Sequence, residues 1–184
     1  MKKNKTARRD FLKLSAIALG GIALAPAIAE AKQKSGILQI PFDDKKLNIL
    51  CLGAHPGDPE FGCGGTMAKY SDTGHHVTFL YITRGEASDP NKTYDQMAAL
   101  RTAEAQTSCK ILNATPQFFG QIDGNTVLNK AENDKMYKII QDIKPDLLFT
   151  QWPVDGHPDH QVTGMLALTA WSAPTVLFTS TFMK

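Results

Sequence analysis

Apolar segments alternate with polar or amphipathic segments along most of the chain. Leu47–Leu52 is a short and nearly continuous apolar run, as expected for a strand that is buried on both faces. Val77–Thr83 is rich in β-branched and aromatic residues and predicts a second strand. Between them, the glycine-rich segment Gly62–Gly65 precedes a predicted helix that ends near Asp72. Together these segments have the dimensions of a right-handed strand–helix–strand unit.

The same alternation continues toward the C-terminus. It predicts helices at about Tyr94–Leu112, Glu132–Ile143 and Gln161–Trp171, and strands at Gln117–Phe119, Asp146–Gln151 and Thr175–Thr179. Strands that alternate with helices favour an α/β fold, here a Rossmann-like three-layer open sheet with mostly parallel strands. Ligands of such sheets bind beyond the carboxyl ends of the strands.

The N-terminal segment has a different character. Basic residues precede an apolar stretch, Leu14–Ala29, which is short for a membrane span of about 20 residues. The run Arg8–Lys13 resembles a twin-arginine export signal, and small residues end the apolar stretch at Ala29-Glu30-Ala31. We therefore expect a cleavable signal at residues 1–31, a partnership with the twin-arginine export machinery, and a periplasmic or extracellular location. A polar linker at residues 32–46 and one domain at residues 47–184 complete this interpretation.

Charge and length limit the classes of function. The formal net charge is +2, but the first 31 residues hold six Lys or Arg and two Asp or Glu, which leaves 14 basic and 16 acidic residues in the remainder. A slightly acidic domain argues against a nucleic-acid binder, which needs a clustered basic face. A chain of 184 residues with 42% hydrophobic residues suits one globular domain. The oligomeric state does not follow from the sequence.

The three cysteines, Cys51, Cys63 and Cys109, cannot all pair with one another. They lie in a predicted strand, a glycine-rich loop and a predicted helix, and no Cys-x-x-Cys spacing indicates a zinc knuckle or a redox motif. We expect free thiols, with a disulfide or a functional Cys63 as the alternative.

Two polar clusters follow predicted strands and carry the candidate chemistry. His55 and Asp58 lie in a loop that its two prolines hold out of helix, and His157-Pro158-Asp159-His160 forms the second cluster. A single histidine at a strand end is more often structural, but these clusters should meet in one crevice. Two imidazoles and a carboxylate with an open position are the usual ligands of a catalytic zinc ion. His75 and His76 are expected in a solvated turn.

These residues resemble the two signature motifs of the PIG-L/LmbE-like N-acetylglucosaminyl deacetylases. The similarity rests on Ala54-His55-Pro56-x-Asp58, with Glu60 and Gly64-Gly65 after it, and on His157–His160, and it extends from about Leu47 to Trp171. The resemblance implies hydrolysis of an acetyl amide on a small amino sugar, with Zn²⁺ as the cofactor.

The resemblance also implies roles for single residues. His55, Asp58 and His160 match the zinc ligands, and His157 matches a catalytic histidine that stabilises the oxyanion or protonates the leaving amine. Asp159 matches a catalytic-site carboxylate that orients a histidine. Arg101 matches a substrate-contacting arginine, although an ion pair with Glu104 on the helix surface explains it equally well. Asp123 could contact sugar hydroxyls or simply belong to the turn Asp123–Asn125.

The sequence departs from the family pattern in two places. The family motif reads His-Pro-Asp-Asp and its first aspartate is the general base, whereas this chain has Gly57 there. Asp159, Glu60, or water ionised by zinc together with His157 are the possible substitutes. Family domains also continue well beyond the second motif, so we expect a C-terminally truncated sheet; a frameshift or a partner chain are the alternatives.

Two further classes of function remain to be compared with the deacetylase. Because Gly57 cannot accept a proton, a non-catalytic metal-dependent carbohydrate-binding protein is the alternative. A dinucleotide-dependent oxidoreductase would share the α/β pattern, but Gly-x-Gly-x-x-Gly is missing after the first strand, which places this class last.

Overall fold

The computed structural model describes residues 45–171 and 176–179 of the chain. The predicted export signal at residues 1–31 and the predicted linker up to residue 44 lie outside the described residues, as does the chain after Thr179. Among the helices of the described part, none has the length and apolar character that a membrane span requires.

A parallel sheet forms the centre of the domain. The described strands are β1 (Asn48–Gly53), β2 (His76–Tyr81), β3 (Thr115–Phe118), β4 (Leu147–Gln151) and β5 (Val176–Thr179), in the order β3-β2-β1-β4-β5. Every neighbouring pair is parallel. The connecting helices are α3 (Asp58–Asp72), α4 (Tyr94–Ile111), α5 (Lys130–Ile143) and α6 (Pro158–Ala170).

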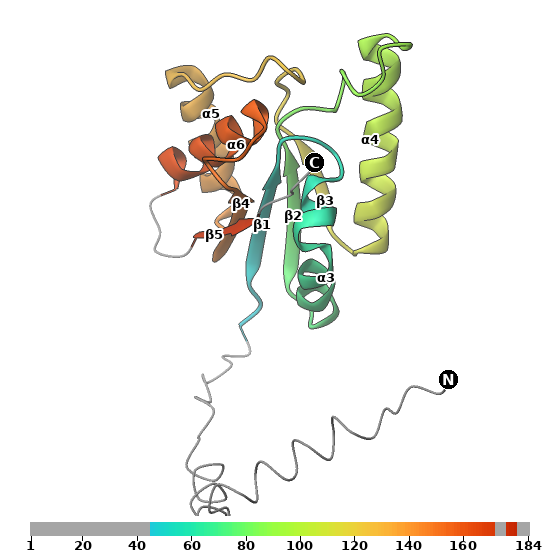
Figure 1. Ribbon diagram of the computed structural model, residues 1–184. Helices are drawn as coiled ribbons and strands as arrows, with labels where there is room; N and C mark the ends of the chain where they lie inside the picture. The colour runs from blue at the N-terminus through green and yellow to red at the C-terminus, as the bar shows by residue number, and fades with distance from the viewer. Residues whose placement is uncertain (1–44, 172–175, 180–184) are drawn as a thin grey trace, which may run out of the picture. The chain divides into compact units, whose positions relative to one another are not determined.

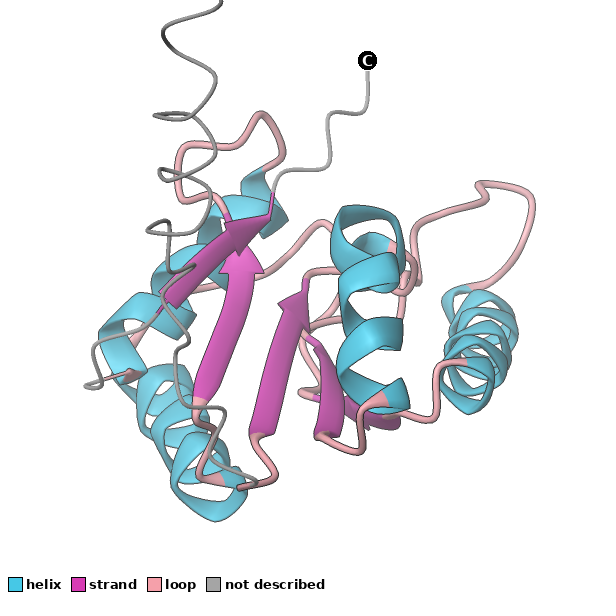
Figure 2. Ribbon diagram, turned by 90° about the horizontal axis from the view of Figure 1, so that it is seen from below, coloured by secondary structure: helices cyan, strands magenta, loops and turns pink. Residues whose placement is uncertain are grey.

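Helices cover both faces of the sheet, which gives the three layers that the sequence predicts (Figures 1 and 2). In β1, the side chains of Leu50 and Leu52 belong to the apolar cluster beneath α5 and α6. Ile49 and Cys51 belong to the cluster beneath α3 and α4. All four side chains are essentially inaccessible to solvent, so the continuous apolar run reflects burial on both faces.

The order of the strands in the sheet reverses at the boundary between β1 and β4, which are neighbours in space. The chain proceeds from β1 outward to β3 on one side, then returns to place β4 and β5 on the other side. Such a switch point separates the loops that follow the two central strands and opens a crevice at their carboxyl ends. The loops after β1 and β4 therefore flank the same crevice.

Three helices begin earlier than the sequence pattern predicts: α5 by two residues, at Lys130, and α3 and α6 at first turns that contain proline. Helix α3 begins at Asp58 with Pro59 in its first turn, and α6 begins at Pro158. Proline is well tolerated in a first turn because its missing N–H would have no partner there. The expectation that two prolines keep residues 54–60 out of helix therefore holds for residues 54–57 and is wrong for residues 58–60, and Cys63 lies at a kink within α3.

The third strand also differs slightly from its prediction. β3 spans Thr115–Phe118 and includes Pro116, whereas the sequence pattern gives Gln117–Phe119. β3 lies at one edge of the described sheet, so a residue without an N–H donor is accommodated there.

Gly164 provides a test of how closely α6 packs on β4. A methyl group at Gly164 would lie 2.6 Å from the carbonyl oxygen of Gln151, whereas one at the exposed Gly65 in α3 would meet nothing within 4 Å. We expect Gly164→Ala to lower the free energy of unfolding by about 1–3 kcal/mol through overpacking. Gly65→Ala should raise it by up to about 1 kcal/mol, because alanine favours helix.

Urea unfolding of both variants against the parent chain measures the difference. Equal stabilisation by the two substitutions would show that α6 does not contact β4 as described.

Candidate metal centre

The two polar clusters meet at the carboxyl ends of β1 and β4. β1 leads into the loop 54–57 and then into Asp58, the first residue of α3. β4 leads through residues 152–156 to His157, the N-cap of α6, which places His160 in the first turn. β1 and β4 are direct parallel neighbours, so the clusters converge as the sequence predicts.

Gln151, the last residue of β4, links the strand to the loop after β1. Its side-chain oxygen accepts a hydrogen bond from the backbone N–H of Ala54 at 3.0 Å, and its side-chain nitrogen donates to Asp58 Oδ2 at 3.1 Å. The backbone N–H of His55 also donates to Asp58 Oδ2, at 2.8 Å. The Asp58 carboxylate is thereby oriented before any ligand binds. The sequence analysis missed Gln151, although a polar residue at the end of a buried apolar strand is a usable signal.

His55, Asp58 and His160 form a compact group of possible metal donors. His55 Nδ1 lies 3.3 Å from Asp58 Oδ2, and His160 Nε2 lies 3.4 Å from the same oxygen. One donor atom from each residue can be chosen so that all lie within 4.8 Å of one another. This separation allows one ion to contact all three, with metal–ligand bonds of about 2 Å.

The His160 side chain shows that a cation fits this group. His160 is 2% exposed, and within the described part of the chain neither ring nitrogen has a hydrogen-bond partner of good geometry. A buried imidazole without partners is costly, so a missing partner is implied. Asp155 Oδ1 lies 3.3 Å from His160 Nδ1, which leaves Nε2 facing Asp58 as the ligating atom.

The other ring nitrogen of His55 faces two carboxylates. His55 Nε2 lies 3.0 Å from Asp159 Oδ2 and 3.1 Å from Asp123 Oδ1. Asp159 is in turn fixed by Thr126 Oγ1, which donates to it at 2.7 Å, and by the backbone N–H of Gly124 at 2.8 Å. A carboxylate behind a ligating histidine sets the tautomer and orientation of the ring. Asp159 thus lies where it can orient His55, as the sequence analysis expects.

Asp123 is more than a turn residue in this structure. Its Oδ2 accepts a hydrogen bond from the backbone N–H of Ala87 at 3.0 Å, while its own N–H donates to the buried Glu86 at 3.3 Å. These bonds bring the turn after β3 to the loop after β2. The sequence analysis missed Thr126 and Glu86, because their partners come from other elements of the fold.

The charges in this group shift one another's protonation equilibria. Burial alone would lower the pKa of His55. Hydrogen bonds, first to Asp123 and then to Asp159 and Asp58, outweigh burial and raise this pKa to about 11. Burial would raise the pKa of Asp58, but its close contacts with the His160 and His55 rings hold this pKa well below its usual range. Burial would likewise raise the pKa of Asp159, but hydrogen bonds from His55, Thr126 and the backbone of Gly124 outweigh burial and lower it.

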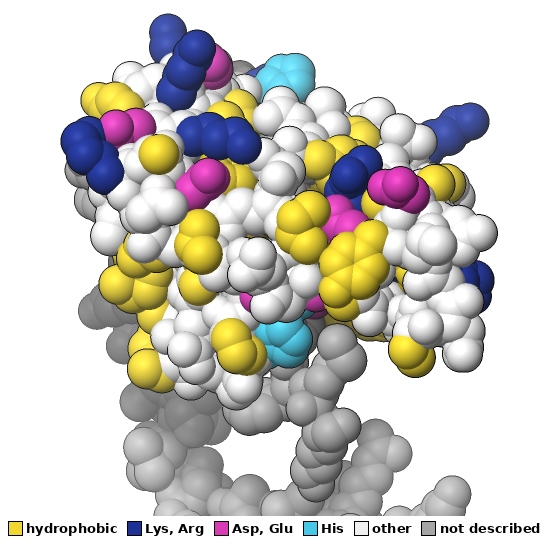
Figure 3. Space-filling model, turned by 90° about the horizontal axis from the view of Figure 1, so that it is seen from above, with side chains coloured by type: hydrophobic (Ala, Val, Ile, Leu, Met, Phe, Trp, Pro, Cys, Tyr) yellow, Lys and Arg dark blue, Asp and Glu magenta, His cyan; other side chains and the backbone are white. Residues whose placement is uncertain are grey.

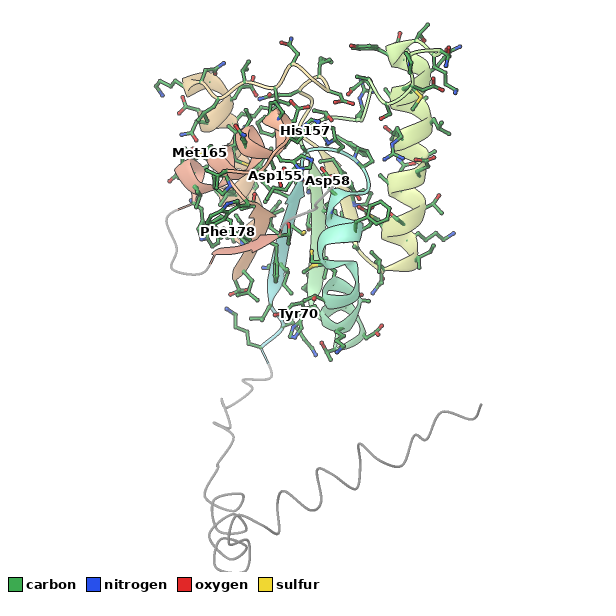
Figure 4. The ribbon with its side chains drawn as sticks, viewed as in Figure 1. Asp58, Tyr70, Asp155, His157, Met165 and Phe178 are labelled. Carbon is green, nitrogen blue, oxygen red and sulfur yellow. The ribbon has the colours of Figure 1, made fainter. Side chains whose placement is uncertain are left out.

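A pocket of about 430 Å³ opens above this group. Its walls come from the loops after β1, β2, β3 and β4 and from α3 and α4, namely His55, Pro56, Gly57, Asp58, Phe61, Ala87, Ser88, Arg101, Asp123, Gly124 and His157. Figure 4 shows Asp58, Asp155 and His157 together at this end of the sheet. Seen from above in Figure 3, acidic side chains and a histidine reach the surface side by side.

His157 is the exposed histidine of the pocket, and its tautomer is fixed. Its Nδ1 accepts a hydrogen bond from the backbone N–H of Asp159 at 3.2 Å. The neutral ring must therefore carry its proton on Nε2. The ring stacks on His160 with 4.7 Å between centroids. His157 is thus placed to donate a hydrogen bond to a bound ligand.

Arg101 supports the loop that carries His55. Its guanidinium donates to the backbone carbonyl of Pro56 and also pairs with Glu104. The structure is therefore compatible with both interpretations of Arg101, substrate contact and ion pairing, since the residue lines the pocket and forms the helix-surface ion pair with Glu104. His75 and His76 lie at the opposite, amino end of β2, where His75 Nδ1 accepts the N–H of Leu47.

The backbone φ of Gly57 is 104°, a conformation that residues other than glycine rarely adopt. The Gly57 N–H donates to Glu60 Oε2 at 3.1 Å, while Glu60 Oε1 accepts hydrogen bonds from the hydroxyls of Tyr81 and Ser108. Glu60 lines a neighbouring hollow and not the pocket above the donor group. Its carboxylate is thus engaged by three donors and does not line the pocket above the donor group.

Comparison with known proteins places this arrangement in a family. Residues 50–171 match the profile of the PIG-L family, described as GlcNAc-PI de-N-acetylase. A diacetylchitobiose deacetylase from Thermococcus kodakarensis is 31% identical over 139 residues, which cover 72% of this chain and 51% of the relative. A 1D-myo-inositol 2-acetamido-2-deoxy-alpha-D-glucopyranoside deacetylase from Salinispora arenicola is 25% identical over 158 residues. The match covers 70% of this chain and 51% of the relative.

Solved structures agree with these sequence matches. An N,N'-diacetylchitobiose deacetylase from Pyrococcus horikoshii, solved with its inhibitor, superposes with a TM-score of 0.66 at 28% identity, covering 92% of this chain and 60% of that chain. This chain spans about half the length of the curated relatives that it matches. The profile covers both polar clusters and the strands that carry them, and on this ground the chain belongs to the PIG-L family.

Proposed function

We propose that this protein is a zinc-dependent hydrolase that removes the acetyl group from an N-acetylated amino sugar. The observation that carries the proposal is the convergence of His55, Asp58 and His160 donor atoms at the base of a pocket. The relatives named above are deacetylases of acetylated amino sugars, which supports the same reaction class. Acetate and a free amino sugar would be the products.

His55, Asp58 and His160 would hold the zinc ion. When bound, zinc polarises the acetyl carbonyl and lowers the pKa of water in the site to about 7. His157 Nε2–H is the donor available for the negative charge that develops on the carbonyl oxygen. The same N–H can deliver a proton to the leaving amine.

The remaining pocket residues would position the sugar. The Asp123 carboxylate lines the pocket and is fixed by Ala87, so it can accept hydrogen bonds from sugar hydroxyls. Arg101 presents a cationic edge to the pocket while it holds the carbonyl of Pro56. Binding energy from these groups would orient the amide against the attacking water.

The general base is the weak point of the site. Of the possible substitutes, Glu60 is bound by Gly57, Tyr81 and Ser108, and both oxygens of Asp159 already have partners. His157 is fixed as a donor at Nε2. We therefore favour a route in which no side chain serves as the base and the proton of the attacking water would pass to solvent. Hydrolysis by this route is slower than hydrolysis assisted by a positioned general base, which typically raises the rate by roughly 10²–10⁴-fold.

Gly57 is also the observation that favours a second candidate function. A protein that binds zinc and an acetylated sugar without turnover would keep the donor group and the pocket and lack the base. The φ of 104° at Gly57 strengthens this alternative, because the loop itself is shaped around glycine.

We further propose that the protein is exported through the twin-arginine route. The support is the run Arg8-Arg9-Asp10-Phe11-Leu12-Lys13 followed by a short apolar stretch. Proteins that carry this type of signal are exported after folding, which suits a metalloenzyme that acquires its ion beforehand.

Removal of one donor should abolish metal binding. We expect the dialysed parent chain to hold one zinc ion and His160→Ala to hold less than a tenth of this amount, because a required ligand is lost. Asp159→Asn should bind zinc roughly 10–100-fold more weakly than the parent, since the Asp159 carboxylate orients His55 through the ring nitrogen that faces away from Asp58. His76→Ala, at the exposed start of β2, is the matched control and should match the parent. Elemental analysis and competition with a chelator measure both quantities, and equal zinc in His160→Ala would contradict the assigned site.

Substitution of Gly57 separates the two candidate functions. Acetate release from a panel of N-acetylglucosamine derivatives is measured for the parent chain, Gly57→Asp and Gly57→Asn. The Asn variant shares the strain of a side chain at φ 104° and lacks the proton acceptor, so it isolates the effect of the base. For a deacetylase with another route to the proton, we expect the parent to be active and the two variants to differ by less than tenfold.

A zinc-loaded parent that is inert on the whole panel would instead support the binding protein. Recovery by Gly57→Asp of roughly 10²–10⁴-fold over Gly57→Asn would then show that only the base is missing.

Export can be tested by exchange of the arginine pair. Replacing Arg8 and Arg9 with lysines should keep the full-length precursor in the cytoplasm, while the parent yields a shorter product in the periplasmic fraction. Immunoblots of cell fractions measure both forms. Equal periplasmic amounts of parent and variant would refute the twin-arginine assignment.

A further inference from the structure

Cys51 and Cys63 lie with their sulfur atoms 3.3 Å apart. Cys51 is in β1 and Cys63 is in α3, and both are thiols in this structure, as the sequence analysis expects. A disulfide requires about 2.05 Å between sulfurs, so they must approach by only about 1.3 Å. The third cysteine, Cys109, has its sulfur 3.5 Å from the hydroxyl of Tyr81. The geometry therefore singles out one pair.

The two sulfurs differ in their access to solvent. Cys51 is fully buried between Phe79 and Phe149, its register partners on β2 and β4. Cys63 is partly exposed and lines a surface hollow of about 410 Å³ with Thr66 and Lys69. A reagent in solution can consequently reach Cys63 and not Cys51.

The backbone at Cys63 departs from helical geometry. Its φ of −151° and ψ of 17° interrupt α3. Its sulfur lies 3.4 Å from the carbonyl oxygen of Pro59, one turn earlier, so the side chain points back toward β1. An irregular turn gives the backbone room to adjust when the sulfurs approach, which a regular helix does not offer.

We propose that Cys51 and Cys63 are a redox modification site that forms an intramolecular disulfide by exchange with a low-molecular-weight disulfide. The Cys63 thiolate attacks one sulfur of the reagent and releases one thiolate, which leaves a mixed disulfide on Cys63. Cys51 then attacks the Cys63 sulfur, and the second reagent thiolate departs and takes up the Cys51 proton. The protein loses two electrons and two protons, and the reagent is reduced to two thiols.

The electrostatics of the pair agree with this order of attack. The hydrogen bond between the two thiols lowers the pKa of Cys63 and raises the pKa of Cys51 well above its usual range. Because the same hydrogen bond is the largest cause of the raised pKa of Cys51, loss of the Cys63 thiolate in the mixed disulfide removes it. Cys51 then becomes a more effective second nucleophile.

The disulfide would close residues 51–63 into a ring that contains His55 and Asp58. Chain-entropy arguments give a ring of this size a sizeable stabilising effect, which corresponds to a rise in Tm of about 5–10 °C for a domain of this length. The proposal does not depend on the deacetylase activity, because thiol mapping and Tm are independent of turnover.

The test oxidises the native 184-residue chain with glutathione disulfide, blocks remaining thiols by alkylation, and maps peptides by mass spectrometry. We expect the parent and the control Cys109→Ala to lose two thiols, to yield a linked Cys51–Cys63 peptide pair, and to gain about 5–10 °C in Tm that dithiothreitol reverses. Cys51→Ala should stop at a glutathione adduct on Cys63, and Cys63→Ser should leave Cys51 unmodified.

The parent chain alone decides the question if a variant fails to fold. Three unmodified thiols after oxidation, a link to Cys109, or a persistent adduct on Cys63 in the parent would overturn the proposal.

Discussion

Parallel pairing of β1 with β4 is the constraint on which the site depends. Ile49, Leu50 and Cys51 lie in register with Leu147, Leu148 and Phe149, although almost a hundred residues separate the strands in sequence. This pairing brings Asp58, which follows β1, within 3.4 Å of His160, which follows β4. Gln151 then joins the two strand ends by hydrogen bonds to Ala54 and Asp58. The donor group is therefore a product of sheet topology and not of either loop alone.

The protein surrounds one histidine with acidic groups. His55 contacts Asp58 through one ring nitrogen and both Asp123 and Asp159 through the other. Carboxylates this close repel one another unless a positive charge lies between them, which explains the raised pKa of His55 and the lowered values of its partners. A divalent cation that displaced the His55 proton would supply the same positive charge.

Much of the fold and of the donor group could be predicted from the sequence, because both depend on local patterns. The apolar run at β1 and the strand signal at β2 fix a parallel unit, and the topology rule then brings His55 and His160 together. The sequence pattern places the first turns of α3 and α6 too late, because apolar periodicity begins after them and because Pro59 suggests a loop and not the start of a helix. Gln151 and Thr126 were missed because their hydrogen bonds join segments that only the folded chain brings together.

The close packing of α6 on β4 also fixes the position of one histidine of the donor group. Gly164 lets the helix approach the Gln151 carbonyl so closely that a methyl group there would lie 2.6 Å from the oxygen. The distance of His160 from the end of β4 is therefore set by backbone packing. His55, by contrast, is held by side-chain contacts with three carboxylates. The two histidines are thus anchored differently, one by the backbone of the fold and the other by ionisable side chains.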